Sequence, residues 1–123
     1  MTYPEVFSRL TFETAILVFM KKNGDVRLML GTRNINTIAI KYGFQGSALA
    51  GHDNRCSIKN GNVAVFDLIL GEARSFHIDR LVSIEFLGEI KDEAALNDAA
   101  ARYSQFEAEY NKSKPTEITM ESL

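Results

Sequence analysis

Arginines carry the most distinctive chemistry in this chain, and four of them form two pairs of equal spacing. Arg27 and Arg33 are six residues apart in a largely apolar stretch, which places both on one face if that stretch is a strand. Arg74 and Arg80 are also six apart. A guanidinium fork binds phosphate in a bidentate way, and Phe76, between the second pair, could stack on a base. The pattern predicts a site for a nucleic acid or a nucleotide-like anion.

The alternative interpretation of the second pair is structural. Arg74 would form an ion pair with Asp67, and Arg80 with Asp79 or Glu85. Such pairs are common and contribute little to stability where they are exposed. Binding and ion pairing predict different effects of substitutions at Arg74 and Arg80, so such substitutions distinguish the two interpretations.

Other kinds of chemistry have little support in the sequence. His77 either donates to a ligand and senses pH, or is an ordinary surface histidine. Cys56 and His52 are four apart, but no further metal-ligand spacing accompanies them. No activating base is indicated for Cys56, and no pair of carboxylates is placed for general acid–base catalysis. We therefore expect a protein that is not an enzyme and that holds no metal or cofactor.

Composition predicts one ordinary globular domain. The chain has 123 residues, of which 46% are hydrophobic and 24% charged. A net charge of −2 argues against a general nucleic-acid coat but allows a local basic patch. The single cysteine, the lack of a visible signal peptide and the short apolar runs lead us to expect a cytoplasmic protein with no membrane partner.

The first elements are a short helix and a hairpin. We expect the helix over residues 1–10, with Pro4 near its start. Strands follow over residues 13–22 and 25–33, joined by Asn23-Gly24, the preferred pair for a two-residue type I′ turn.

That turn would set the register of the hairpin. It pairs Lys22 with Asp25 and Phe19 with Leu28, and it leaves both faces of the hairpin largely apolar. A helix, the following loop or another subunit must cover the extra face. Because closed symmetric assemblies are the common outcome for such surfaces, we expect a homo-oligomer, a dimer.

Residues 34–60 lack a clear period and are predicted to be a long loop. Asn34 would cap a helical turn at its start, and the alternation of Ile40, Tyr42 and Phe44 indicates a short strand within it. Loops of this length are often functional. We take it as a recognition loop, with four candidate ligand-binding side chains: Lys41, Tyr42, His52 and Arg55.

Three further strands are predicted between residues 61 and 87. If Gly71-Glu72 forms a two-residue turn, Asp67 pairs with Phe76, and Asp67 and Arg74 become diagonal neighbours on one face.

One long helix is predicted over residues 92–112, with Asp92 as its N-cap. Its apolar residues recur at helical spacing and suit either the core or a dimer seam: Leu96, Ala99, Tyr103, Phe106 and Tyr110. Pro115 ends the helix. We expect a single domain over residues 1–112 and a disordered tail over residues 113–123.

Two segments resemble a known family. Residues 26–34 form the first, and the second joins residues 66–68 to residues 74–81. The second segment has an arginine, an aromatic residue, a two-residue step and then Asp79-Arg80-Leu81, as at the end of a WYL domain. The chain therefore resembles the WYL-like proteins, most closely the small stand-alone ones of tailed phages, with Val65-Phe66-Asp67-Leu68 in place of the Trp-Tyr-Leu triplet.

The resemblance implies a fold and a class of function. The fold is a mainly β, Sm-like or SH3-type barrel of about five bent antiparallel strands, with a helix at each end of the chain. The function is that of a non-enzymatic phage accessory protein, in the host cytoplasm, whose arginine-lined barrel binds a nucleic acid or nucleotide. The alternative is a protein that inhibits a host defence or transcription factor, which the acidic balance and the doubly apolar hairpin favour.

Overall fold

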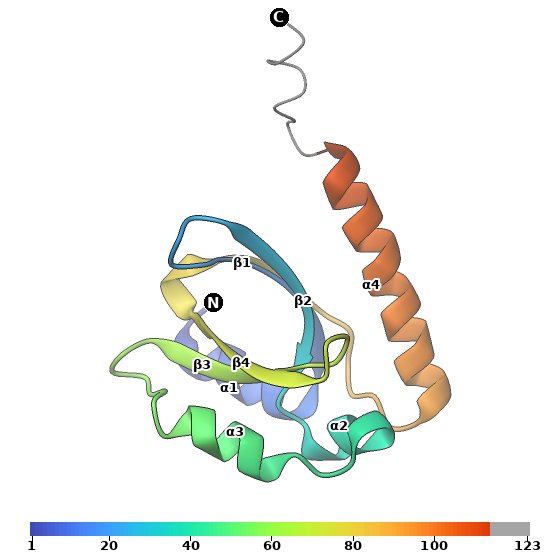
Figure 1. The fold of residues 1–123 in the computed structure, drawn as a ribbon, viewed down its shortest axis with the longest axis horizontal. Helices are drawn as coiled ribbons and strands as arrows, with labels where there is room; N and C mark the ends of the chain where they lie inside the picture. Colours follow the sequence, from blue (N-terminus) through green and yellow to red (C-terminus); the bar gives the residue numbers. More distant parts are fainter. Residues whose placement is uncertain (114–123) are drawn as a thin grey trace, which may run out of the picture.

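Five antiparallel strands form one strongly bent sheet in the computed structural model, which describes residues 1–113 (Figure 1). The strands are β1 (Thr14–Met20), β2 (Val26–Thr32), β3 (Asn62–Asp67), β4 (Glu72–His77) and β5 (Leu81–Phe86). Their order in the sheet is β4-β3-β2-β1-β5. The predicted class, a mainly β barrel of five antiparallel strands, is confirmed.

Helices flank the sheet at both ends of the chain, as predicted. The helical elements are α1 (Tyr3–Phe12), α2 (Ile35–Tyr42), α3 (Gly46–Asp53), the 3-10 turn η1 (Ile78–Arg80) and α4 (Glu93–Ser113). Thr2 and Glu5 form a capping box at the start of α1. The Asp92 carboxylate accepts from the Ala95 N–H at 2.8 Å, so the predicted cap of α4 is also confirmed. Most of the predicted tail lies outside the described residues.

The β1–β2 hairpin has a three-residue loop where a two-residue turn was predicted. Lys21 N–H donates to Asp25 O at 2.7 Å, and Gly24, with a φ of +91°, donates to Lys21 O at 3.0 Å. A three-residue loop with its last residue left-handed is a common hairpin type. Phe19 therefore pairs with Arg27, one residue away from the predicted partner. The shift puts Arg27 on the face of Phe19, whereas the prediction had placed it on the other face.

The β3–β4 hairpin also has a longer loop than predicted. Asp67 pairs with Glu72, so the predicted pairing of Asp67 with Phe76 is wrong. The Asp67 carboxylate accepts two backbone N–H groups of the loop, each at 2.9 Å, which stabilises the wider turn. Asp67 and Arg74 are still diagonal neighbours on one face, as expected.

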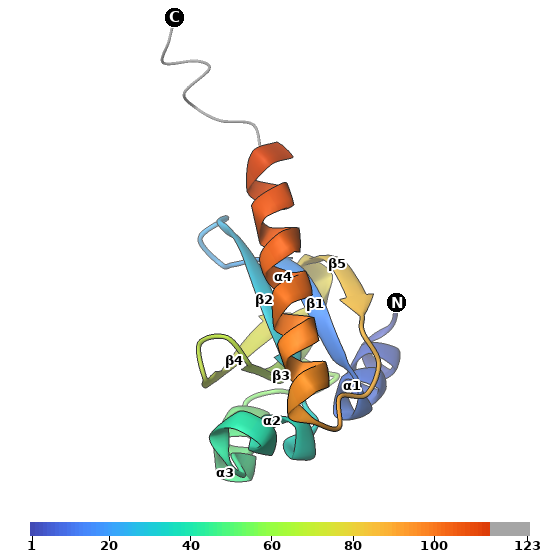
Figure 2. The ribbon, with the colours of Figure 1, turned by 90° about the vertical axis from the view of Figure 1, so that its right-hand side faces the viewer.

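The inward face of the sheet packs against α1. Val6 and Leu10 of α1 are fully buried and complete the inner apolar cluster. The strands contribute Ala15, Leu17, Phe19, Met29, Val63, Val65 and Phe76 to this cluster. Figures 1 and 2 show α1 across one end of the barrel, with the β1–β2 loop at the other.

The outward face packs against the remaining helices. Figure 2 shows α4 along the outside of β2, with α2 and α3 beneath its start. The outer cluster joins Ile16, Leu30, Phe66 and Leu68 to Ile38 of α2, Leu49 of α3 and the α4 residues Leu96, Ala99 and Tyr103. The chain's own helices thus cover the second apolar face of the hairpin. Leu96, Ala99 and Tyr103, the first three residues of the apolar stripe predicted for α4, therefore belong to the core.

Two helices replace most of the predicted long loop. Asn34 does cap α2, since its Oδ1 accepts the N–H groups of Asn36 and Thr37 at 3.0 and 3.3 Å. The expected short strand through Ile40 and Tyr42 is wrong, because both residues lie in α2. Over so few residues, apolar side chains two apart do not distinguish the period of a strand from that of a helix. Ile40 and Tyr42 form a helix here because it packs them against the outer cluster.

Candidate functional site

An open groove follows the unpaired edge of β4, opposite the end of the β1–β2 hairpin. It consists of two adjoining hollows of about 390 and 430 Å³, which share Phe19, Lys21 and Ser75. β4 pairs with β3 alone, so its other edge is open toward this groove. The residues from Ala73 to His77 supply one wall.

Basic side chains surround the groove. Its cationic residues come from the hairpin, from β4 and from η1: Lys21, Lys22, Arg27, Arg74 and Arg80. Both histidines of the chain, His52 and His77, also line it. Within residues 1–113, no Asp or Glu is among the lining residues of either hollow. A groove with walls of one sign focuses a positive potential, even though the chain as a whole is acidic.

Arg74 is held by two carboxylates at the edge of this groove. Its Nε lies 3.5 Å from Asp67 Oδ2, and its Nη2 forms an ion pair with Glu72. The side chain is 25% exposed, whereas that of Asp67 is 4% exposed. The predicted ion pair with Asp67 is confirmed, and it neutralises a buried carboxylate.

Arg80 differs from Arg74 in having no carboxylate partner within residues 1–113. The predicted pairs with Asp79 and Glu85 are wrong. Glu85 pairs with Arg102 of α4, and the Asp79 carboxylate lies 3.9 Å from His77. Arg80 is exposed at the end of η1, so its guanidinium is available to a ligand.

His77 lies at the other end of β4 from Glu72. Its Nδ1 accepts the Asp79 N–H at 3.1 Å, which caps η1 and leaves Nε2 to carry the proton of the neutral ring. The ring packs on Gly61, where a Cβ would come within 2.8 Å of it. These contacts hold the imidazole in place at the wall of the groove.

Phe76 forms part of the floor and not an exposed stacking surface. It is 3% exposed, and its ring centroid lies 5.5 Å from that of Phe19 in the inner core. The expectation that this ring stacks on a base is therefore wrong for this conformation. A buried aromatic pair instead gives the groove a rigid apolar base.

Arg33 lies outside the groove, contrary to the prediction. It follows β2 and is 11% exposed. Its guanidinium donates to both carboxylate oxygens of Asp53, at 2.9 and 3.1 Å, and to Ala64 O at 2.7 Å. It also stacks 4.1 Å from the ring centroid of Phe7. Arg33 thus joins α3, β3 and α1, which is a structural role.

The four residues of the predicted recognition loop are dispersed. His52 lies at the groove. Lys41 lines a separate pocket beside α4. Tyr42 packs on Phe66 and donates its hydroxyl to Leu68 O at 2.6 Å. Arg55 is exposed beyond α3 and lines neither hollow of the groove.

Sequence reasoning missed several groove residues. Lys21 and Lys22 directly precede the Asn-Gly turn, a position at the tip of a hairpin that could have marked them as exposed cations. Ser75 and Asn62 have no such signal, because they join the groove through the pairing of β3 with β4.

The described residues can also be checked for metal ligands, for a reactive thiol and for membrane-spanning helices. Residues 1–113 contain no group of three or more His, Cys, Asp or Glu residues that could hold a metal ion. Burial raises the pKa of the Cys56 thiol, which lowers its thiolate content. None of the described helices is both long and apolar enough to cross a bilayer.

Comparison with known proteins identifies the family. A family model described as "WYL_2, Sm-like SH3 beta-barrel fold" matches residues 5–82, which is more than half of the chain. The chain belongs to the WYL_2 family. The predicted resemblance to WYL-like proteins is confirmed, and so is the Sm-like barrel. No curated protein and no solved structure matched the chain.

The matched WYL_2 region contains the whole basic groove. It runs from α1 to the start of β5, and every groove residue from Phe19 to Arg80 lies within it. The helix α4 lies outside the match. The groove therefore belongs to the WYL_2 barrel itself.

Proposed function

We propose that this WYL_2 protein binds a phosphate-bearing anion, a nucleic acid strand or a nucleotide, without catalysing a reaction. The observation that carries the proposal is the groove along β4, which is lined by five cationic side chains and by no carboxylate within the described residues. Phosphate contacts from Lys and Arg supply most of the affinity of nonspecific nucleic-acid binding.

The form of the groove supports an extended ligand. Two hollows adjoin end to end and remain open to solvent, with Arg27 and Arg74 beside one and His77 and Arg80 beside the other. A strand that presents several phosphates can contact both hollows at once. A mononucleotide would occupy one of them.

The cations differ in their availability. Arg74 already forms ion pairs with Asp67 and Glu72. Lys21, Lys22, Arg27 and Arg80 have no carboxylate partner within residues 1–113. We expect these four side chains to carry ligand binding, and Arg74 to contribute chiefly to stability.

Binding of a fluorescent single-stranded oligonucleotide, followed by anisotropy, tests the proposal. We expect Arg80→Ala and Arg27→Ala to weaken binding about 10-fold or more, which corresponds to the roughly 1.5–3 kcal/mol of a hydrogen bond to a charged group. Arg80→Lys keeps the charge but loses the fork, so its affinity should be intermediate. Affinity of the natural chain should fall as salt is raised.

Arg55→Ala is the matched control, because Arg55 is an exposed arginine that does not line the groove. It should leave affinity unchanged. Arg74→Ala should lower the melting temperature by leaving Asp67 unpaired in the core. If Arg80→Ala and Arg27→Ala fold normally and bind the oligonucleotide as tightly as the natural chain, the groove is not the binding site. Competition by ATP or by inorganic phosphate separates a strand from a smaller ligand.

A protein partner is the second candidate, as an inhibitor of a host defence or transcription factor. Several large apolar side chains away from the groove favour it by their exposure, among them Phe44 at 74%, Ile58 and Val82. Pull-down from host lysate with and without nuclease distinguishes the two. Capture that survives nuclease supports the protein partner, and capture lost with nuclease supports the groove. The phage setting, which the WYL-like resemblance implies, is part of this proposal.

A further inference from the structure

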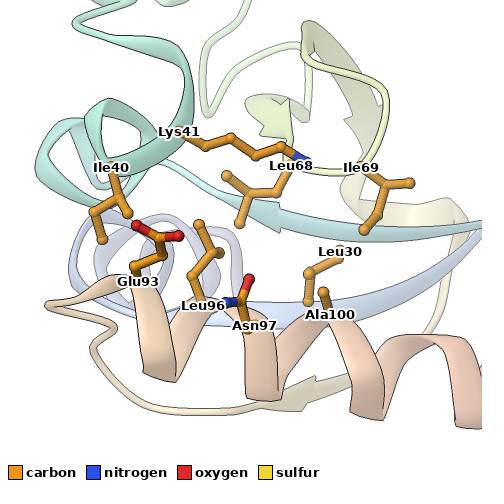
Figure 3. Close-up of a pocket in the computed structure, with 9 residues that line it drawn as sticks. All are labelled: Leu30, Ile40, Lys41, Leu68, Ile69, Glu93, Leu96, Asn97 and Ala100. Carbon is orange, nitrogen blue, oxygen red and sulfur yellow. The ribbon is translucent and has the colours of Figure 1, made fainter.

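A second pocket, of about 280 Å³, lies between α2, α4 and the loop that follows β3 (Figure 3). It shares no lining residue with the basic groove. Six of its nine lining residues are apolar: Leu30, Leu68 and Leu96 come from the core, and Ile40, Ile69 and Ala100 complete the set. Pockets of this kind, with a few polar groups at the edge, are the usual form of a small-molecule site.

Two side chains of opposite charge reach this pocket, Lys41 from α2 and Glu93 from α4. Within residues 1–113 neither has an ion-pair partner, so more than 4.0 Å separates the Lys41 nitrogen from the Glu93 carboxylate. Figure 3 shows Lys41 extended over Leu68, with the Glu93 carboxylate beside Ile40. The two charges thus approach the pocket from different sides, with apolar wall between them.

Asn97 adds a polar group to the same pocket, one turn of α4 beyond Glu93. Its amide can both donate and accept a hydrogen bond. The pocket therefore offers a cation, an anion, an amide and an apolar surface, in a volume that admits a small ligand.

We propose that this pocket binds a free amino acid with an apolar side chain. Such a molecule carries its carboxylate and its ammonium group on one carbon, so the exposed side chains of Lys41 and Glu93 turn toward each other across the pocket to contact them, and its own side chain packs against the leucines. A ligand with a carboxylate alone would lie near Glu93 with no compensating charge, and an amine alone would face Lys41 in the same way. A zwitterion satisfies both side chains, so charge complementarity favours it over either ion.

Calorimetric titration of the full chain with L-leucine tests this site. We expect N-acetyl-L-leucine, which lacks the ammonium group, and L-leucinamide, which lacks the carboxylate, each to bind at least tenfold more weakly. The two analogues also resemble the C-terminal and N-terminal residues of a peptide, so they separate a free amino acid from a peptide end. Glycine should bind weakly, since it lacks the apolar group.

Variants of the two charged residues locate the site. Lys41→Gln and Glu93→Gln should each weaken leucine binding at least tenfold, and because both residues are exposed, both variants should fold. Lys91→Gln and Glu89→Gln are the matched controls, as exposed charges near the start of α4 that do not line the pocket. They should leave binding unchanged. Ala100→Leu should fill the pocket and abolish binding.

Three results would overturn the proposal. The first is no heat of binding with leucine, isoleucine, methionine or phenylalanine at millimolar concentration. The second is equal binding of leucine and one of its two analogues. The third is unchanged leucine binding in folded Lys41→Gln and Glu93→Gln proteins.

Discussion

Surroundings determine what each arginine of this protein can do. Arg33 is nearly buried and forms bonds with Asp53 and Ala64, whereas Arg80 is exposed and has no carboxylate partner within residues 1–113. Both carry the same charge in the sequence. A guanidinium that already donates to fixed acceptors has few donors left for a ligand.

Arg33→Ala should reduce the free energy of unfolding by about 1.5–3 kcal/mol, as for the loss of hydrogen bonds to a charged group. The substitution removes three hydrogen bonds and the stacking on Phe7. Urea denaturation measures the change. The control is Arg55→Ala, an exposed arginine with no ion pair in the described part of the chain, which should change stability little. Equal stability of the two variants would contradict the structural role of Arg33.

Tyr103 should make stability depend on alkaline pH. Burial, and then the neighbouring Glu107 carboxylate, raise the pKa of Tyr103 from 10.0 to about 12. The folded state therefore holds the phenol proton more tightly than the unfolded state, so this stabilisation is complete below about pH 10 and is lost as pH rises toward 12. A shift of this size corresponds to about 2–3 kcal/mol.

Urea denaturation between pH 9 and pH 12 measures the effect. The comparison is with Tyr103→Phe, which removes this phenol and keeps every other ionisable group of the protein. That variant loses the hydrogen bond to Leu28 O but should show a smaller loss of stability between pH 10 and 12. Parallel pH profiles of the two proteins would show that Tyr103 does not contribute.

At the scale of elements, loops and caps position the groove. The three-residue loop of the β1–β2 hairpin turns Arg27 onto the face of Phe19, and Asp67 holds the wide turn before β4. The first loop depends on Gly24 and the second on the Asp67 carboxylate, and both residues are visible in the sequence. The number of residues in each loop depends on which backbone hydrogen bonds the whole sheet allows.

Gly31 lies where two neighbouring side chains approach the backbone of β2 closely. A Cβ at this position would lie 2.8 Å from Val65 Cγ2 and 3.0 Å from Leu17 Cδ1, both of which are fully buried. Gly31→Ala should therefore destabilise the barrel by about 1–3 kcal/mol, as overpacking does. Thermal or urea unfolding measures this change.

Gly51→Ala is the matched comparison in α3. Apart from the adjacent residues and the backbone of the helix itself, no atom lies within 4 Å of a Cβ there, and alanine favours helix, so this variant should gain about 0.5–1 kcal/mol. A destabilised Gly51→Ala, or a neutral Gly31→Ala, would contradict the packing described here.

At the scale of the whole molecule, α4 extends beyond the barrel that it covers. Leu96, Ala99 and Tyr103 are buried, whereas Phe106 and Tyr110 farther along the same stripe are partly exposed. Figures 1 and 2 show this half of α4 projecting away from the strands. Tyrosine and phenylalanine on such a face suit a protein interface.

The predicted dimer is thus expected to form through the free half of α4. Light scattering at micromolar concentration should give about twice the mass of the 13.8 kDa chain. Tyr110→Glu places a charge on the stripe without touching the barrel core and should yield the monomer. Glu109→Gln, on the polar side of the same turn, is the control. A 13.8 kDa particle for the natural chain would rule this assembly out at that concentration.

Local patterns in the sequence determined the type of most elements. Apolar runs on either side of the Asn23-Gly24 turn marked the first hairpin, the helical spacing from Leu96 to Tyr110 marked α4, and the arginine-aromatic-Asp-Arg segment indicated the WYL-like family. These signals depend on residues close together in the chain, and they hold whatever the rest of the fold does.

Tertiary structure alone decided the registers, the helices between residues 34 and 60, and which basic residues share the groove. Lys21, His52 and Arg74 line the same hollow of the groove, although they are far apart in the sequence. They come together because the β1–β2 hairpin, α3 and β4 meet at this hollow. Arg33 leaves the predicted site because Asp53 and Ala64 bind it across the fold. Such contacts depend on the folded positions of distant segments, which neither composition nor spacing specifies.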